Sequence, residues 1–228
     1  EYSQDGISHY GLEDIGVMRI QPDVTVIAPA DYIQAGTALS KTWNLPGPIY
    51  YRLGKDEKNI VQGLDGCFDT GHIQIIREGH DILFITTGSI TGEVIKASEI
   101  LDTYDISSTV ALVANIHPPP IEDLSDIISK AHLVITVESH YITGGIGSLT
   151  AEVIAENRLD CKLIRCGIKQ MPNGISGSQD YLYRINGISA DILANTALKA
   201  VNDVKITNSI SNQDYLYRIN GISADVLA

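Results

Sequence analysis

The stretch DILFITTGSITGEVIKASEIL, residues 81–101, decides the fold class of this 228-residue chain. Its apolar run ILFIT ends at Thr-Gly, as is typical of a strand that is buried on both faces. The residues that follow place Val94, Ala97 and Leu101 on one face of a helix. A buried strand that leads into an amphipathic helix predicts an α/β unit with a parallel sheet.

The same alternation continues towards the C-terminus. Apolar strands that are spaced by amphipathic helices indicate a mostly parallel sheet with helices on both faces. We therefore expect a three-layer α/β domain over residues 72–203. Its further elements are strands at 108–116, 132–139 and 161–168 and helices at 118–131, 148–158 and 190–201.

Residues 9–53 repeat the pattern in a shorter form: helix, strand, helix, strand. Leu12, Ile15 and Met18 share one helical face, and Asp31 is placed to cap the second helix. This is half of an α/β sheet unit, which predicts a partial domain over residues 1–55. Charged, glycine-rich residues with weak periodicity follow, so we interpret 56–71 as an interdomain linker.

The chain end carries an internal repeat. Residues 179–194 read QDYLYRINGISADILA, and residues 213–228 read the same except for valine in place of Ile192. Such close identity favours a duplication of the chain end over a solenoid, which needs three or more looser repeats. Because a compact domain has one place for this segment, we expect residues 204–228, the duplicated tail, to be poorly packed.

Composition narrows the classes of partner. The formal net charge is −12, which disfavours binding to nucleic acid or to an anionic membrane through bulk charge. No apolar run reaches the roughly 18–20 residues that span a bilayer. Cys67, Cys161 and Cys166 lack metal-ligand spacing, and the histidines form no zinc motif. We expect reduced thiols, a cytoplasmic protein and no metal site built by this chain alone.

Two polar stretches are candidates for a functional site. SQDGISHYGLEDIGVMR, residues 3–19, places Asp5 and His9 in a turn before a helix. By themselves these residues favour an ordinary turn with a solvated imidazole. SHYITGGIGS, residues 139–148, is a glycine-rich turn that lacks the spacing of a nucleotide site, so we favour a structural role. Glu138 and His140 next to it are weaker catalytic candidates.

The order of these elements resembles the C-terminal half of transketolase. The resemblance covers roughly residues 3–201, and three segments carry it: SQDGISHYGLEDIGVMRIQPDVTVIAPAD, GPIYYRLGK and VESHYITGGIGSLTAEVIAE. It implies that residues 1–55 are the end of a pyrimidine-binding domain and that 72–203 are the transketolase C-terminal domain. The chain departs from the family motif D-G-P-T-H at Ile7 and Ser8.

The resemblance also implies roles for three residues. Asp5 and His9 match the acid and the histidine that face the substrate beside the cofactor, where sugar hydroxyls and their protons are managed. Arg52, in YYRLGK, matches an arginine that binds the phosphate of the sugar substrate, for which a guanidinium is well suited. From the residues alone, the sequence supports two interpretations of Arg52 equally: a phosphate-binding arginine, or an arginine at a strand end in a surface salt bridge.

The implied cofactors are thiamine diphosphate and Mg²⁺, held mainly by residues of an N-terminal half upstream of Glu1. The expected function is the C-terminal portion or subunit of a transketolase that is inactive alone. Its expected partners are sugar phosphates, the N-terminal half and further copies of itself. Two alternatives stay open: a non-catalytic dimerisation or regulatory homologue, and an enzyme like 1-deoxyxylulose-5-phosphate synthase.

Overall fold

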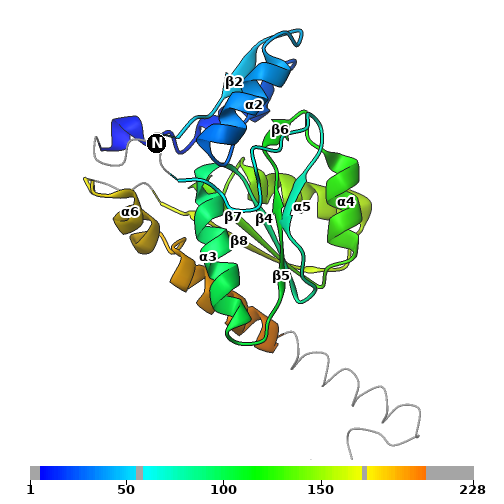
Figure 1. Ribbon diagram of the computed structural model, residues 1–228, viewed down its shortest axis with the longest axis vertical. Helices are drawn as coiled ribbons and strands as arrows, with labels where there is room; N and C mark the ends of the chain where they lie inside the picture. The colour runs from blue at the N-terminus through cyan, green and yellow to red at the C-terminus, as the bar shows by residue number, and fades with distance from the viewer. Residues whose placement is uncertain (1–5, 55–58, 171–173, 204–228) are drawn as a thin grey trace, which may run out of the picture.

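The larger sheet carries the predicted α/β alternation. The computed structural model describes residues 6–54, 59–170 and 174–203, and within them this sheet has the strand order β3-β5-β4-β7-β8 (Figure 1). All neighbouring strands are parallel except the edge strand β3, which runs antiparallel to β5. The mostly parallel α/β fold is therefore confirmed. The strands are β3 Gln74–Arg77, β4 Ile82–Thr86, β5 Ser108–Leu112, β7 Leu133–Tyr141 and β8 Lys162–Ile168.

Helices cover both faces of this sheet and complete the three layers. One face packs against α3 and the helix over 190–203, through Leu101 and Leu193 among others. The other face packs against α4 and α5, through Leu124 and Val153. The predicted helix at 190–201 is present. The bounds are η3 Gly88–Ile90, α3 Thr91–Asp102, α4 Ile121–Ser129, α5 Ile146–Asn157 and α6 Gln179–Ile185.

A second, smaller sheet has the order β2-β1-β6 and lies above the first in Figure 1. Helix α1 covers one of its faces, where Ile15 packs on Val26. Helix α2 covers the other, where Ala38 packs on Ile27. The first helix begins later than its pattern predicts, because a 3-10 turn precedes it. The bounds are η2 Ile7–His9, α1 Asp14–Arg19, β1 Thr25–Ile27, α2 Tyr32–Thr42, β2 Ile49–Tyr51 and β6 Asn115–His117.

Strand β6 connects the two sheets. The sequence predicts one strand over 108–116, but the chain leaves the larger sheet after Leu112. The following residues, β6, pair antiparallel with β1, with Val26 opposite His117. Periodicity cannot detect this change of sheet, because both parts of the run are apolar and buried.

The expected linker is packed rather than extended over its described residues, 59–71. Val61, Leu64 and Phe68 are buried against α2. The carboxylate of Asp31 caps α2, as predicted, by accepting from Gln34 N at 2.8 Å, and it also accepts from Val61 N at 2.9 Å. This segment is therefore part of the core, and the proposed domain boundaries stay predictions.

The first copy of the repeat is part of the larger domain. Ser178 caps α6, and Tyr183, Ile188 and Leu193 are buried on the face that packs against α3. The second copy and the rest of the duplicated tail, 204–228, lie outside the described residues.

Candidate functional site at the junction of the two sheets

The carboxyl ends of β4, in the larger sheet, and of β1, in the smaller sheet, meet. Gly88, after β4, donates its backbone N–H to the carbonyl of Ala28 at 3.2 Å. Ala28, after β1, donates in turn to the carbonyl of Ala114 at 2.8 Å. Open α/β sheets bind ligands at the carboxyl ends of their strands. In this chain the smaller sheet covers that edge of the larger one, so functional side chains are to be sought around the junction.

Arg52 binds three segments at this junction and is only 8% exposed. Its Nε donates to both carboxylate oxygens of Asp14, at 3.1 and 2.9 Å. Its Nη2 donates to the carbonyl oxygens of Gly11, at 2.8 Å, and Ser139, at 2.9 Å. Tyr50 donates its hydroxyl to Asp14 at 2.7 Å, and burial together with this carboxylate raises the pKa of Tyr50 to about 12. These contacts hold the guanidinium in one orientation.

His9 lies in a segment, residues 6–12, that is anchored at one end. Tyr10 and Leu12 are each 5% exposed and belong to the core under α3, whereas His9 is exposed. The carbonyl of Leu12 accepts from Tyr141 N, at the end of β7, at 2.9 Å. Because Tyr10 and Leu12 are held in place, the His9 imidazole lies at the surface, next to the junction.

Glu138 occupies the N-terminus of α5. Its side chain is fully buried, and its oxygens accept from Ile146 N at 2.9 Å and from Gly147 N at 3.0 Å. Burial raises the pKa of Glu138 to about 7, although the two backbone donors favour the charged form. A Cβ on Gly145 would lie 1.8 Å from the carboxylate. The chain's own carboxylate thus fills the place of an external anion, which supports the structural interpretation of the glycine-rich turn.

His140 joins β7 to α1. The ring is fully buried, and its Nδ1 lies 2.6 Å from the carbonyl of Tyr141, which can only accept, so Nδ1 carries the proton. Nε2 then accepts from Gly16 N at 3.2 Å. Burial lowers the pKa of His140, which keeps the imidazole neutral. Like Glu138, His140 holds the junction together and is closed to solvent.

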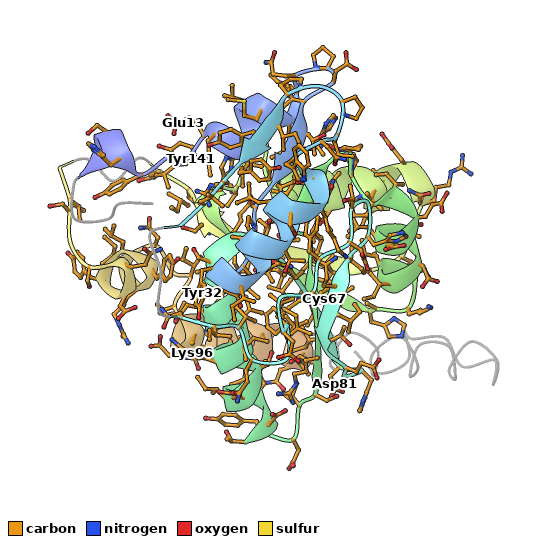
Figure 2. All side chains as sticks on the ribbon, turned by 45° about the horizontal axis from the view of Figure 1, so that its top comes forward. Glu13, Tyr32, Cys67, Asp81, Lys96 and Tyr141 are labelled. Atoms are coloured by element: carbon orange, nitrogen blue, oxygen red, sulfur yellow. The ribbon has the colours of Figure 1, made fainter. Side chains whose placement is uncertain are left out.

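A cavity of about 420 Å³ opens beside this contact, between α1 and the turn after β7. Figure 2 shows Glu13 and Tyr141 next to each other at this place. The other side chains around it are mostly apolar, with one cation. They include Val17, Ile20, Ile142, Ile168 and Lys169.

Comparison with known proteins identifies the fold. Residues 71–193 match the family described as "Transketolase, C-terminal domain". The chain belongs to the transketolase family. It is 37% identical over 194 residues to a "Putative transketolase C-terminal section" of Methanocaldococcus jannaschii, a match that covers 84% of this chain and 60% of that protein.

Subunits of transketolases are similar as well. A protein of Actinobacillus succinogenes that is described as a subunit of apulose-4-phosphate transketolase is 34% identical, over 84% of this chain and 61% of its own length. The 1-deoxy-D-xylulose-5-phosphate synthase of Dictyoglomus thermophilum is 29% identical, over 90% of this chain but 33% of its own length. The chain thus spans about three fifths of the transketolase sections and subunits that it matches.

A solved structure described as "Split gene transketolase, inactive beta4 tetramer" has the same fold. It is 28% identical with a TM-score of 0.74, over 84% of this chain and 61% of that chain. The resemblance to transketolase and the α/β class are therefore both confirmed.

The three predicted site residues of this transketolase-family chain have different outcomes. Asp5 lies outside the described residues. His9 and Arg52 come to the same junction, since Arg52 binds the carbonyl of Gly11, two residues after His9. Substrate contact by Asp5 and His9, and phosphate binding by Arg52, stay predictions.

Sequence reasoning missed Asp14 and Tyr50, the partners of Arg52. A signal for Asp14 was present, because it precedes Met18 by four residues and so shares the predicted apolar face of the helix. An acid on a buried face needs a cation or donors as partners. No local pattern could have identified Tyr50, whose neighbours in β2 are also bulky.

Neither a metal site nor a membrane span is found among the described residues. Within 6–54, 59–170 and 174–203, no group of three or more His, Cys, Asp or Glu side chains could hold a metal ion. Over the same ranges, no helix is both long enough and apolar enough to cross a bilayer.

Proposed function

We propose that this chain is the C-terminal section of a thiamine-diphosphate-dependent transketolase that transfers a two-carbon ketol unit between sugar phosphates. The observation that carries the proposal is the similarity, over most of the chain, to proteins described as transketolase C-terminal sections and subunits. Thiamine diphosphate supplies the nucleophilic carbon for such a transfer. This chain would supply side chains that contact the substrate.

His9 is the proposed acid–base group. An imidazole takes up and releases protons near neutral pH, which suits the movement of protons on sugar hydroxyls. Its Nδ1 lies 2.9 Å from the hydroxyl of Ser8, which would orient the ring. Asp5 would bind a neighbouring substrate hydroxyl, and Arg52 would bind the substrate phosphate.

An N-terminal section is the proposed partner. It would hold the diphosphate and Mg²⁺. Among the described residues of this chain, no group of three or more His, Cys, Asp or Glu side chains could hold a metal ion. The chain alone would then be inactive. The similarity to a structure described as an inactive beta4 tetramer supports this view and also supports self-association of this chain. We further propose a cytoplasmic, pentose-phosphate role, in keeping with three cysteines that form no disulfide.

Reconstitution tests the proposal. The chain is mixed with the N-terminal section encoded beside it or with that of a split transketolase, plus thiamine diphosphate and Mg²⁺, and ketol transfer between sugar phosphates is measured. Activity is expected only in the mixture. Replacement of His9 by alanine should lower kcat by about 10²-fold or more, because general acid–base catalysis contributes about that much.

The control is His80→Ala, which removes an imidazole whose side chain is 85% exposed, on the loop between β3 and β4. It should leave ketol transfer unchanged. Equal turnover of His9→Ala and wild type would exclude a catalytic role for His9. No transfer in any mixture would favour a non-catalytic dimerisation or regulatory module.

A 1-deoxyxylulose-5-phosphate synthase activity is the second candidate. The 29% identity to such a synthase, over 90% of the chain, favours it. The two activities differ in the donor, because the synthase decarboxylates pyruvate. Release of carbon dioxide from pyruvate by the reconstituted mixture, without ketol transfer from a sugar phosphate, would decide for the synthase.

A further inference from the structure

We propose that Asp14 and Tyr50 are positioning residues of the site, which act through Arg52 to hold the His9 segment, residues 6–12, against the end of β7. The inference deepens the proposed function and rests on it for the role of His9. It assigns a purpose to two half-buried polar side chains that the predicted catalytic set leaves unused.

The geometry links these residues in one chain of hydrogen bonds. Tyr50 binds one oxygen of Asp14, and both carboxylate oxygens bind Nε of Arg52. Nη2 of Arg52 then joins two carbonyl oxygens from segments far apart in sequence, those of Gly11 and Ser139. The guanidinium therefore fastens the end of the His9 segment to β7.

Gly11 is suited to this contact. Its φ of +55° lies in the left-handed region, which turns the backbone between the His9 segment and α1. A side chain at this position would be strained, whereas glycine is not. The carbonyl of Gly11 reaches Arg52 at 2.8 Å. Because Gly11 follows His9 by two residues, movement of Arg52 would displace the imidazole.

Asp14 is what keeps Arg52 in place. The Asp14 and Arg52 side chains are 16% and 8% exposed, so water cannot readily replace either partner. Loss of the carboxylate would leave a buried guanidinium without its counter-charge, and the guanidinium would then reorient towards other acceptors. Tyr50 donates to Oδ2 of Asp14, the oxygen that also accepts from Nε at 2.9 Å, and so restrains the carboxylate in the orientation in which it meets Nε.

The first experiment uses the chain alone and measures backbone amide exchange. Asp14→Asn should accelerate exchange in residues 6–12 by about tenfold, as expected for loss of a charged hydrogen bond. Tyr50→Phe, a milder variant that preserves shape, should cause a smaller acceleration in the same residues. Strand β4, in the middle of the larger sheet, should exchange at the wild-type rate in both variants.

A matched control is available on the surface. Asp102 also pairs with an arginine, through one contact with Nη2 of Arg77, but its side chain is 43% exposed and it lies at the end of α3. Asp102→Asn should leave exchange in residues 6–12 unchanged. The matched control for Tyr50→Phe is Tyr104→Phe, because Tyr104 is 58% exposed.

The second experiment uses the reconstituted mixture and separates positioning from phosphate binding. If Asp14 positions the site, Asp14→Asn lowers kcat by the same factor for phosphorylated and non-phosphorylated acceptors, with little change in KM for the non-phosphorylated acceptor. If the Asp14–Arg52 pair serves phosphate binding alone, KM rises for the phosphorylated acceptor only, and the proposal is wrong. Arg52→Lys should lower kcat for both acceptors as Asp14→Asn does, because lysine cannot bridge the two carbonyls and the carboxylate. It should in addition raise KM for the phosphorylated acceptor, because the proposed function assigns the phosphate contact to this guanidinium.

The two experiments fail independently. Wild-type exchange in residues 6–12 of Asp14→Asn would overturn the positioning proposal, whatever the mixture does. Absence of ketol transfer by the wild-type mixture would instead count against the proposed function, while the exchange measurement would still decide whether Asp14 holds the segment.

Discussion

The backbone N–H of Gly16 donates to Nε2 of His140, 124 residues further along the chain, at 3.2 Å. This bond joins the smaller sheet, through α1, to the end of strand β7 in the larger sheet. It stands next to the buried Glu138 carboxylate, whose Oε2 lies 3.6 Å from Nδ1 of His140. Both side chains are fully buried. Burial disfavours the charged form of each group, so it raises the pKa of Glu138 and lowers the pKa of His140.

Glu138→Gln should change how stability depends on pH. The folded protein keeps the Glu138 proton up to a pH of about 7, whereas the unfolded chain releases it near 4.5. The wild type therefore loses stability as the pH rises between these values, and the glutamine variant does not. Between pH 5 and 8, the free energy of unfolding of wild type relative to the variant should fall by roughly 2–3 kcal/mol.

Urea unfolding at both pH values measures this difference. Glu156→Gln, on the exposed side of α5, is the matched control and should follow the wild type at each pH. A constant difference between wild type and Glu138→Gln would mean that Glu138 has an ordinary pKa in the folded protein.

His140→Phe should destabilise the junction by about 1–3 kcal/mol at pH 8, because Gly16 N loses its acceptor in a buried place. Since the folded-state pKa of His140 is lowered, the wild type loses stability as the pH falls below 6.5. Phenylalanine has no such loss, so the difference between the two proteins should shrink at pH 5.5. Chemical unfolding at the two pH values measures it, with the exposed His132→Phe as control. A difference that grows towards pH 5.5 would contradict the assignment of a neutral ring.

Gly145→Ala should be strongly destabilising. The added Cβ would lie 1.8 Å from Oε2 of Glu138 and 2.8 Å from Nδ1 of His140, both held in place by hydrogen bonds. Displacement of these side chains should cost about 2 kcal/mol or more. Gly92→Ala is the control, because nothing lies within 4 Å of its added Cβ in α3, and it should stabilise by up to about 1 kcal/mol. Thermal unfolding compares the two; similar melting temperatures would refute this packing.

Asp31→Ala should lower the free energy of unfolding by more than the loss of a helix cap does. The carboxylate caps α2 through Gln34 N and also accepts from Val61 N, so two donors lose their acceptor. We expect a loss of about 2–3 kcal/mol, against roughly 1 kcal/mol for Ser178→Ala, which removes the cap of α6 alone. Faster amide exchange at Val61 in Asp31→Ala would show that the segment 59–71 depends on this carboxylate. Equal losses for the two variants would show that the Val61 contact adds nothing.

Much of the fold follows from local patterns. The run at 82–86 and the face formed by Val94, Ala97 and Leu101 specify a strand and a helix of the correct type and place. The cap at Asp31 and the helix over 190–201 were predictable for the same reason. Each depends on residues within a few turns of one another.

The candidate site was only partly predictable. A resemblance to transketolase singled out His9 and Arg52, but no pattern indicated that Arg52 binds Asp14 and the carbonyl of Ser139. The move of β6 to the smaller sheet was missed because a buried strand reads the same in either sheet. Glu138 was a weak catalytic candidate, yet its carboxylate is used by the N-terminus of α5.

The sequence by itself determined the α/β alternation, the repeat at the chain end and the family, because each of these can be recognised from short-range periodicity or from motifs. Only the tertiary structure decided which strand ends meet and which buried charges become partners. The contacts Gly16–His140 and Arg52–Ser139 join residues 124 and 87 positions apart. Such pairings depend on how two sheets pack, and burial then determines the protonation of the groups that lie between them.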